Sequence, residues 1–254
     1  MSNHLNELIE HTLDEVLPSA DEHPVVLSEA MRYAVGSGGK RIRPLICLAS
    51  AVAVGGDMED AKYPAAAIEL LHNYTLIHDD LPAMDNDRER RGRPTVWVKF
   101  GEANAILAGD ALLSLAYQVA AKTPRNVAGI VGILGEKGVG VVRGQVEDLA
   151  ERKDVEFAYL HKTADLFEAA ATMGALAGGG GTCETAALGV FARNLGLAFQ
   201  YEDDLLDGDG AHTREETVRK VEECTARAIA ALEGLPGDTE FLTQLANKLK
   251  ERKI

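Results

Sequence analysis

Residues 74–85 read Tyr74-Thr75-Leu76-Ile77-His78-Asp79-Asp80-Leu81-Pro82-Ala83-Met84-Asp85, a helical pattern that ends in three carboxylates. Apolar residues recur at three- and four-residue spacing before them, which predicts a helix, and Pro82 prevents its continuation. A second acidic stretch, Asp203-Asp204-Leu205-Leu206-Asp207, also lies in an apolar helical run. Two carboxylates about 5 Å apart repel by roughly 3 kcal/mol at an effective dielectric of about 20. We therefore expect a cation between the acids.

The surroundings of the two acidic stretches distinguish them from an ordinary hydrated surface. Asp203 and Asp207 are four residues apart and share one face of the predicted helix. An isolated pair at this spacing is usually a solvated face, but here apolar residues flank the acids and a second such stretch exists. Mg²⁺ typically takes one or two carboxylates together with substrate phosphates. The pattern therefore favours a magnesium site.

Basic residues lie on both sides of the first acidic stretch. Downstream, the segment 86–95 carries Arg90-Arg91, and arginine binds phosphate oxygens through two hydrogen bonds. Upstream, the chain reads Gly38-Gly39-Lys40-Arg41-Ile42-Arg43-Pro44, where glycines before a helix let a phosphate approach the backbone amides. The GxxxxGK[ST] spacing of a P-loop is absent. Each basic element alone could be an ordinary turn or surface pair, but beside the acids they indicate a diphosphate.

Helical periodicity is almost continuous along the chain. It recurs, for example, over residues 106–119 and 217–232, whereas no alternating run bounded by turns indicates a strand. Breaks rich in glycine and proline separate the helices without a linker or a shift in composition. We therefore predict an all-α fold, with about ten helices in a single domain that spans residues 1–254.

Composition narrows the class of protein. The net charge of −14, from 40 acids and 26 bases, argues against nucleic acid as a partner. Cys47, Cys183 and Cys224 fit neither a disulfide framework nor a zinc site, and reduced thiols are expected. No apolar run reaches the roughly 20 residues of a spanning helix, and the first residues lack a signal pattern. We therefore expect a soluble, cytoplasmic protein without a transmembrane segment.

Seven segments occur in a characteristic order, and these are Gly38–Pro44, His72–Asp87, Arg90-Arg91-Gly92, Gly109–Leu113, Gly144–Leu149, Lys162-Thr163 and Gly196–Asp207. Together they resemble the trans-isoprenyl diphosphate synthase family, the polyprenyl synthetases that include farnesyl and geranylgeranyl diphosphate synthases. The resemblance covers residues 28–207. It implies the isoprenoid synthase fold, a single helical bundle around a central active-site cavity.

The resemblance implies a role for each matching position. The family expectation is three Mg²⁺ ions that bridge an allylic diphosphate to acids among Asp79, Asp80, Asp85, Asp203 and Asp207. The allylic diphosphate or the nascent cation would be lined by Arg90, Lys162, Thr163 and Gln200. The diphosphate of isopentenyl diphosphate would be held by Lys40, Arg43, His72 and Arg91. The implied catalytic residues are Asp79, Asp85, Lys162, Thr163 and Asp203.

The chemistry implied by the resemblance is a Mg²⁺-dependent prenyl transfer. The C–O bond of dimethylallyl or geranyl diphosphate ionises because Mg²⁺ and cationic side chains stabilise the departing diphosphate. The double bond of isopentenyl diphosphate attacks the cation, and a proton is then lost, in this family to the leaving diphosphate. The cavity must exclude water, which would quench the cation.

Product length is implied to depend on Tyr74 and Thr75. Tyr74 lies five residues before Asp79, just over one helical turn, and in the family the product grows down a cavity below the first acidic stretch. Helical geometry alone favours a core tyrosine. A tyrosine here, with four residues between Asp80 and Asp85, resembles the bacterial-type farnesyl synthases. We therefore expect farnesyl diphosphate, with geranylgeranyl diphosphate as the alternative.

The match to the family ends after Asp207. The family continues with a lysine-bearing loop and a further helix, but here residues 208–214 run almost directly into the helical segment 217–232. The domain is therefore shortened after the second acidic stretch. Arg214 or Lys220 could supply the missing cation, or the site could be capped less tightly and hydrolyse more substrate.

Three rival functions remain open at the level of sequence. A non-catalytic subunit of a heteromeric prenyl synthase would not need both acidic stretches. A terpene cyclase or head-to-head synthase would not need the isopentenyl site of Lys40, Arg43, His72 and Arg91. A non-enzymatic helical scaffold would not bind a diphosphate mimic with Mg²⁺. Because family members are usually homodimers, we expect a homodimer here.

Overall fold

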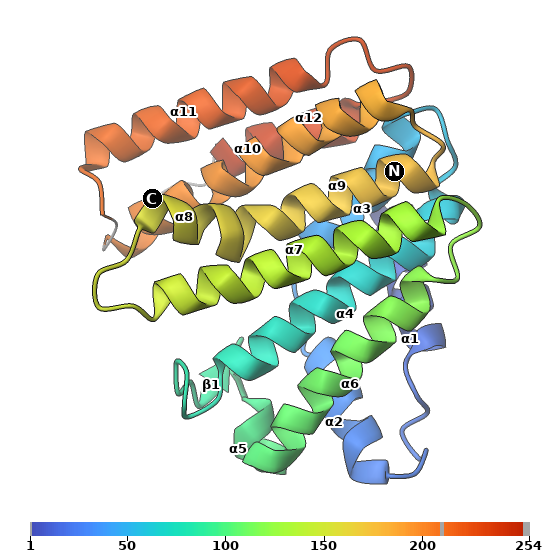
Figure 1. Ribbon diagram of the computed structural model, residues 1–254, viewed down its shortest axis with the longest axis vertical. Coiled ribbons are helices and arrows are strands. Elements are labelled where there is room, and N and C mark those ends of the chain that lie inside the picture. Colours follow the sequence, from blue (N-terminus) through green and yellow to red (C-terminus); the bar gives the residue numbers. More distant parts are fainter. Residues whose placement is uncertain (1, 209–210, 251–254) are drawn as a thin grey trace.

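The computed structural model describes residues 2–208 and 211–250, with backbone only for residues 2, 3, 207, 249 and 250. Within these residues it is almost wholly helical, which confirms the predicted all-α class (Figure 1). The elements are α1 Ser2–Val16, α2 Val25–Val35, α3 Ile42–Ala53, η1 Met58–Ala61, α4 Lys62–Asp79, β1 Glu89–Arg90, β2 Arg93–Pro94, α5 Val96–Phe100, α6 Glu102–Ala120, α7 Val127–Asp148, α8 Val155–Ala158, η2 Tyr159–Ala164, α9 Asp165–Ala177, α10 Thr182–Asp207, α11 Arg214–Ala231 and α12 Glu240–Lys250.

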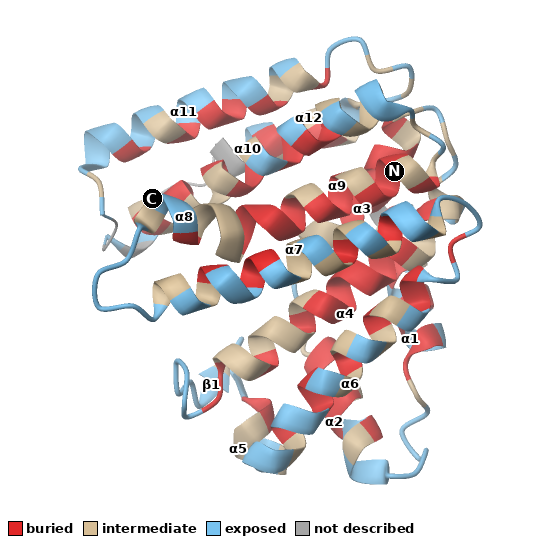
Figure 2. Cartoon of the chain, viewed as in Figure 1, coloured by how far each residue is buried: buried red, intermediate tan, exposed pale blue. Residues whose placement is uncertain are grey.

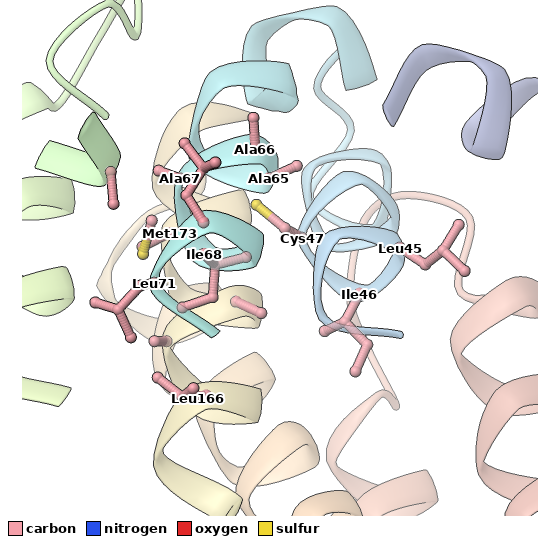
Figure 3. Close-up of a cluster of buried hydrophobic side chains, with 14 of the residues drawn as sticks. Leu45, Ile46, Cys47, Ala65, Ala66, Ala67, Ile68, Leu71, Leu166 and Met173 are labelled. Atoms are coloured by element: carbon pink, nitrogen blue, oxygen red, sulfur yellow. The ribbon is translucent and has the colours of Figure 1, made fainter. Parts of the chain in front are cut away.

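The core lies where α3, α4 and α9 pack together, and small residues let these helices approach closely. Figure 3 shows Cys47 of α3, the alanines 65–67 of α4 and Met173 of α9 meeting in this layer. A Cβ on Gly174 would lie 2.0 Å from the carbonyl oxygen of Cys47, so only glycine fits this crossing. One continuous apolar cluster runs from α1 to α12, and the buried residues concentrate in α4 and α9 (Figure 2).

The segment after α4 forms the single strand pair among the described residues. β1 and β2 are antiparallel, with Arg90 opposite Arg93. Arg91 and Gly92 have φ of 55° and 73° at the turn between them, as the first and second central positions of a type I′ hairpin require. Sequence reasoning predicted no strand here, because a ladder of two residues is too short to show alternation. The hairpin fixes the direction in which Arg90 and Arg91 leave the backbone.

A π-helix interrupts the long helical run between α8 and α9. Tyr159–Ala164 adopts this wider geometry, which occurs mostly as single turns at functional sites. Gly144 of α7 packs against it so closely that a Cβ there would lie 2.3 Å from the backbone nitrogen of Lys162. The sequence did not predict the π-turn, since the same residues have ordinary helical spacing.

Helix α6 corrects the expectation that no segment is long and apolar enough to span a membrane. Glu102–Ala120 meets that test by length and composition, and it does so alone among the described residues. A core helix meets the same test. Here α6 packs against α4 and buries Ala105, Ala108 and Leu112 completely. At this contact a Cβ on Gly109 would lie 2.2 Å from the ring of His78.

The termini of three helices bring the sequence motifs to one side of the molecule. In Figure 1 the end of α4, the α8–η2 segment and the end of α10 lie toward the same side of the bundle. Contacts of η2 with α7, α9 and α10 hold these elements together.

Candidate active site

The first acidic cluster, Asp79, Asp80 and Asp85, forms where α4 ends and the chain reverses. Asp79 is the last residue of α4, and its carbonyl accepts a 2.9 Å hydrogen bond from the amide of Asp85. Burial raises the pKa of Asp79 to about 6; Lys162 opposes this shift, and the charge of Asp85 adds to it. The cluster therefore combines a half-buried carboxyl with a nearby lysine from another helix.

Asp80 is bound by protein rather than directed at solvent. Its side chain is 5% exposed, and its Oδ1 accepts from Arg90 Nε at 2.7 Å and from Nη2 at 2.6 Å. Arg90 also lies 3.4 Å from Asp87. From the sequence, we predicted Asp80 as a metal ligand and Arg90 as a ligand of the allylic diphosphate. In the structure both residues lie at the first acidic cluster, where they form an ion pair with each other.

A basic group, Arg43, His72 and Arg91, lies behind the first cluster. Arg43 Nη1 is 3.2 Å from His72 Nε2, and Arg43 Nε is buried without a hydrogen-bond partner. Burial lowers the pKa of His72 well below its ordinary value, and the charge of Arg43 lowers it further. Burial and the charge of Arg91 lower the pKa of Arg43 to about 10, against the opposing effect of Glu69. Such crowding of positive groups favours binding of an anion.

The glycine-rich turn before α3 holds the basic group in place. Arg91 donates to the carbonyl oxygen of Gly38, and a Cβ on Gly39 would lie 2.8 Å from the Arg91 guanidinium. Gly39 has φ of 135°, so glycine is required there on both counts. Lys40 extends from this turn and is exposed. All four residues predicted for the isopentenyl site therefore lie on or beside α3, α4 and the hairpin.

The second acidic cluster, Asp203, Asp204 and Asp207, occupies the last turns of α10. Asp203 is half-buried, whereas Asp204 is buried and accepts hydrogen bonds from Tyr159 at 2.5 Å and Gln200 at 3.3 Å. Asp207 ends the helix, and its side chain lies outside the described residues. Gly208 caps the helix with φ of 74°.

Lys162 and Thr163 connect the two acidic clusters. Lys162 lies close enough to oppose the pKa shift of Asp79, and its Nζ donates to Asp148 Oδ2 at 2.6 Å. Thr163 Oγ1 donates to Gln200 Oε1 at 2.8 Å, one helical turn before Asp204. The π-turn thus directs one residue toward α4 and the next toward α10. This is the arrangement that the sequence motifs imply for a site shared between the two clusters.

The donor set suits Mg²⁺ together with a phosphate. Within the described residues, no three acidic, histidine or cysteine side chains already converge as a metal centre. Mg²⁺ does not require such a cage, since it usually takes one or two carboxylates and completes its shell with water and substrate phosphate. The raised pKa of Asp79, which burial and the neighbouring Asp85 cause despite Lys162, marks a carboxylate that a cation would stabilise. The residues therefore fit the ion.

Tyr74 and Thr75 lie on α4, about one helical turn before Asp79. The Tyr74 ring packs edge-on against His78, with ring centroids 4.8 Å apart. Burial raises the pKa of Tyr74, and the charges of Asp110 and Asp79 add to the shift. The Tyr74 side chain is therefore directed toward α6 as well as toward the acidic cluster. Thr75 Oγ1 donates back to a carbonyl of its own helix at 2.8 Å.

A second tyrosine, Tyr117 of α6, lies near Tyr74 and was not singled out from the sequence. It contributes to the raised pKa of Tyr74 after burial and the two aspartates. Its hydroxyl would be 3.4 Å from a Cβ on Gly135 and 3.9 Å from one on Gly138, both in α7. Leu71 Cδ1 reaches the same glycine, Gly138, at 3.4 Å. The space beside Tyr74 is therefore bounded by Tyr117 of α6 and by Gly135 and Gly138 of α7.

The segment after α10 places the two cations proposed to replace the missing lysine loop. Lys220 Nζ donates to Glu156 Oε1 at 2.6 Å and lies 3.3 Å from the Tyr201 hydroxyl. Lys220 is therefore engaged with α8 and α10. Arg214, the first residue of α11, is exposed.

The structure adds partners that sequence reasoning did not name. Arg41 is buried and binds Glu69 at 2.8 Å and Glu10 at 2.7 Å, which anchors the basic turn before α3. Tyr159 binds Asp204, and Asp148 binds Lys162. Asp148 lay in a recognised segment, so its motif was a usable signal. Tyr159 and Glu69 carried none, because their partners are distant in sequence.

An all-α bundle with two acidic clusters joined by a lysine, and with an arginine group behind one of them, defines a protein of the isoprenoid synthase class. The polyprenyl synthetase family model matches residues 24–253, and the chain belongs to that family. This confirms the resemblance drawn from the seven segments.

Curated relatives and solved structures agree with this membership. The chain is 45% identical over 219 residues to the large subunit 1 of a heterodimeric geranylgeranyl pyrophosphate synthase of Arabidopsis thaliana, covering 79% of this chain and 58% of that protein. It is 42% identical to a geranylgeranyl diphosphate synthase of Cyanophora paradoxa, covering 79% of this chain and 71% of that protein. The chain thus spans about 58% of the first of these relatives.

Two solved structures are similar over nearly their whole length. A farnesyl/geranylfarnesyl diphosphate (FPP/GFPP) synthase of Zymomonas mobilis superposes with a TM-score of 0.89 at 33% identity, covering 97% of each chain. A geranylgeranyl pyrophosphate synthetase of Pyrococcus horikoshii gives a TM-score of 0.89 at 30% identity, covering 98% of this chain and 96% of that one.

Proposed function

We propose that the protein is a Mg²⁺-dependent short-chain trans-prenyltransferase that condenses an allylic diphosphate with isopentenyl diphosphate. The observation that carries this proposal is that two distinct charged regions, one acidic and one basic, both include residues of α4. Acids and Lys162 lie at the end of the helix, and the group of Arg43, His72 and Arg91 lies behind it. A terpene cyclase has no use for the second region.

The residues divide the work between two diphosphates. Mg²⁺ bound by Asp79, Asp85 and Asp203 would supply charge stabilisation for the allylic diphosphate. Lys162 stands beside Asp79 and carries a positive charge to the same place. Arg43 and Arg91 would hold the other diphosphate, and the low pKa that burial and Arg43 impose on His72 keeps its ring neutral near pH 7. A neutral ring donates a hydrogen bond without adding to the crowding of charge.

For the product we propose geranylgeranyl diphosphate, in place of the farnesyl diphosphate that Tyr74 suggested. Support comes from the relatives, several of which are named geranylgeranyl diphosphate synthases at 42–45% identity. The orientation of Tyr74 against His78 is compatible with a path that continues toward Tyr117. The sequence expectation relied on residue type alone, and residue type does not give the direction of the ring.

The test is an assay of the purified protein with Mg²⁺, isopentenyl diphosphate and each of dimethylallyl, geranyl and farnesyl diphosphate, with products sized by chromatography. We expect condensation that chelation of Mg²⁺ abolishes, ending at the C20 product. Farnesyl diphosphate as the sole product would overturn the chain length but not the activity. Mg²⁺-dependent binding of a bisphosphonate without any condensation would favour a non-catalytic subunit.

Tyr74→Ala and Tyr117→Ala test the path of the growing chain. If Tyr117 bounds it, Tyr117→Ala lengthens the product, whereas Tyr74→Ala changes it little. The reverse result would restore Tyr74 as the floor that the sequence suggested. Tyr63→Phe is a suitable control, because its hydroxyl donates to Glu15 at 3.4 Å in an exposed position.

We also propose that two copies of the chain associate through α7. Exposed apolar side chains recur along it and at the residue that follows it, at spacings of three and four residues, and these are Val139, Val142, Val146 and Leu149. Such a stripe is typical of a helix that packs against a partner. Light scattering of Val142→Glu/Val146→Glu should give a smaller species than the unmodified protein. A monomeric unmodified protein would exclude the homodimer, and the large subunit of the Arabidopsis heterodimer makes a second kind of partner worth testing.

A further inference from the structure

Two tyrosines and two carboxylates join α8–η2 to α10 in a reciprocal arrangement. Tyr159 of η2 donates to Asp204 of α10 at 2.5 Å, and Tyr201 of α10 donates to Glu156 of α8 at 2.6 Å. The two rings pack edge-to-face, with centroids 5.6 Å apart. Each segment thus contributes one donor and one acceptor. This exchange fixes both the distance between the segments and their register.

The arrangement continues into the residues of the site. The other oxygen of Asp204 accepts from Gln200 Nε2 at 3.3 Å, and the Gln200 carbonyl oxygen accepts from Thr163 at 2.8 Å. Both ends of the Asp204 carboxylate are therefore occupied by protein donors. Because Tyr159 is three residues before Lys162, the bond to Asp204 holds the beginning of the π-turn that carries Lys162 and Thr163.

On its other side the arrangement reaches the segment that follows the second acidic cluster. Lys220 of α11 donates to Glu156 at 2.6 Å, and His212 Nε2 lies 3.0 Å from the same oxygen. The Lys220 ammonium also lies 5.0 Å from the centre of the Tyr201 ring. Glu156 is thereby the point where α8, α10 and α11 meet. Hydrogen bonds to ionised groups are roughly twice as strong as neutral ones.

We propose that Glu156, Tyr159, Tyr201 and Lys220 form a clamp through which helix α11 holds Lys162 and Thr163 against the second acidic cluster. These four are positioning residues for the prenyl transfer proposed above, on which the inference rests. Lys220 therefore acts through Glu156 and not as a direct ligand of the diphosphate. Arg214 takes no part in the clamp.

Burial makes each of these hydrogen bonds difficult to replace. Tyr201 is 3% exposed and Asp204 is 9% exposed, so water cannot replace a lost partner easily. A phenylalanine at either tyrosine keeps the ring and removes the contacts of its hydroxyl, which for Tyr201 are those to Glu156 and Lys220. The Tyr→Phe variants therefore separate the clamp from the general packing of the bundle.

The first measurement is hydrogen exchange in the metal-free protein, which does not depend on activity. Tyr159→Phe, Tyr201→Phe and Lys220→Met should each raise amide exchange in residues 155–164 by about fivefold or more, with little change in α3 and α4, since local opening of a segment reflects its own contacts. Tyr63→Phe is the matched control and should leave exchange in this segment unchanged.

The second measurement is binding of methylenediphosphonate with Mg²⁺, followed by steady-state kinetics. We expect weaker binding and a kcat reduced about 10- to 100-fold, as misplacement of a catalytic group produces. KM for isopentenyl diphosphate should not change, because its site lies on α3 and α4. The reduction in kcat of the double variant Tyr159→Phe/Tyr201→Phe should be smaller than the product of the reductions in the two single variants.

A uniform rise in exchange across the bundle, with unchanged methylenediphosphonate binding, would show that these residues only stabilise the fold and would overturn the clamp. Wild-type protein that binds methylenediphosphonate but never condenses substrates would refute the proposed function. In that case the local exchange result still decides whether the clamp exists.

Discussion

Each acidic cluster consists of two adjacent aspartates followed by a third. The second aspartate of each cluster, Asp80 or Asp204, accepts hydrogen bonds from a different kind of donor. Asp80 in the first cluster is bound by the charged guanidinium of Arg90 at 2.6 Å. Asp204 in the second is bound by the neutral groups of Tyr159 and Gln200. One negative charge is thus offset inside the first cluster, whereas Asp204 in the second accepts hydrogen bonds from neutral groups.

The difference shows how two similar motifs divide their roles. The first cluster lies between Lys162 and the arginines, so positive groups surround it before any ion binds. In the second, Asp204 accepts its hydrogen bonds from the neutral side chains of Tyr159 and Gln200. We therefore expect the second cluster to depend more strongly on Mg²⁺. Substitutions in the two clusters can test this inequality.

Removal of a proposed Mg²⁺ ligand should have the largest effect. Asp79→Asn and Asp203→Asn should each lower kcat by about 10²–10³-fold, since charge stabilisation of the leaving group is the main catalytic term. Asp203→Asn should also raise the Mg²⁺ concentration for half-maximal activity more than Asp79→Asn does. Equal Mg²⁺ requirements would refute the inequality. Glu29→Gln, an exposed position on α2, is the control.

Loss of the charged donor should destabilise the protein more than loss of the neutral one. Arg90→Met leaves the buried Asp80 without its cation and should lower the free energy of unfolding by roughly 2–3 kcal/mol. Tyr159→Phe should cost about 1 kcal/mol by the same measure. Urea unfolding in EDTA compares the two. A larger loss for Tyr159→Phe would reverse the comparison of the middle carboxylates.

The raised pKa of Asp79 gives a pH dependence with a defined sign. Burial, with Asp85 adding and Lys162 opposing, raises this pKa from 3.8 to about 6, so the folded protein holds the proton more firmly than the unfolded chain. This group therefore stabilises the metal-free protein at low pH, and that contribution falls as the pH rises from about 4 to 6. Asp79→Asn should remove this pH-dependent contribution, which is roughly 3 kcal/mol for a shift of about two pKa units. Unfolding midpoints of both proteins across pH 4–7 test this, and parallel curves would contradict it.

The smallest effect is expected at Asp148, which binds two lysines. Lys153 donates to it at 3.0 Å from an exposed position, whereas Lys162 donates at 2.6 Å from the π-turn. Lys153→Ala should change stability by about 0.2–1 kcal/mol and leave kcat unaltered. Lys162→Ala should reduce kcat strongly. Similar kinetic effects would mean that Lys162 acts only as a partner of Asp148.

Much of the site was predictable because its motifs are local. The end of α4 at Pro82 and the glycine-rich turn before α3 follow from residues within a few positions of each other. The direction of Asp204 could not be predicted, since Tyr159 lies 45 residues away. Nor could the ring of Tyr74, which is why residue type favoured a shorter product than the relatives suggest. The metal-binding and substrate-binding roles of these residues remain predictions.

The helical class, the two acidic stretches, the basic groups and the family could all be inferred from the amino-acid sequence, because periodicity and short ordered motifs are sufficient to identify them. Tertiary structure decided which acids are engaged by protein. Arg90 takes Asp80, Tyr159 takes Asp204, and Lys220 turns to Glu156. The physical reason is that a buried carboxylate must find donors wherever the fold provides them, and the chain order does not record which distant side chain arrives.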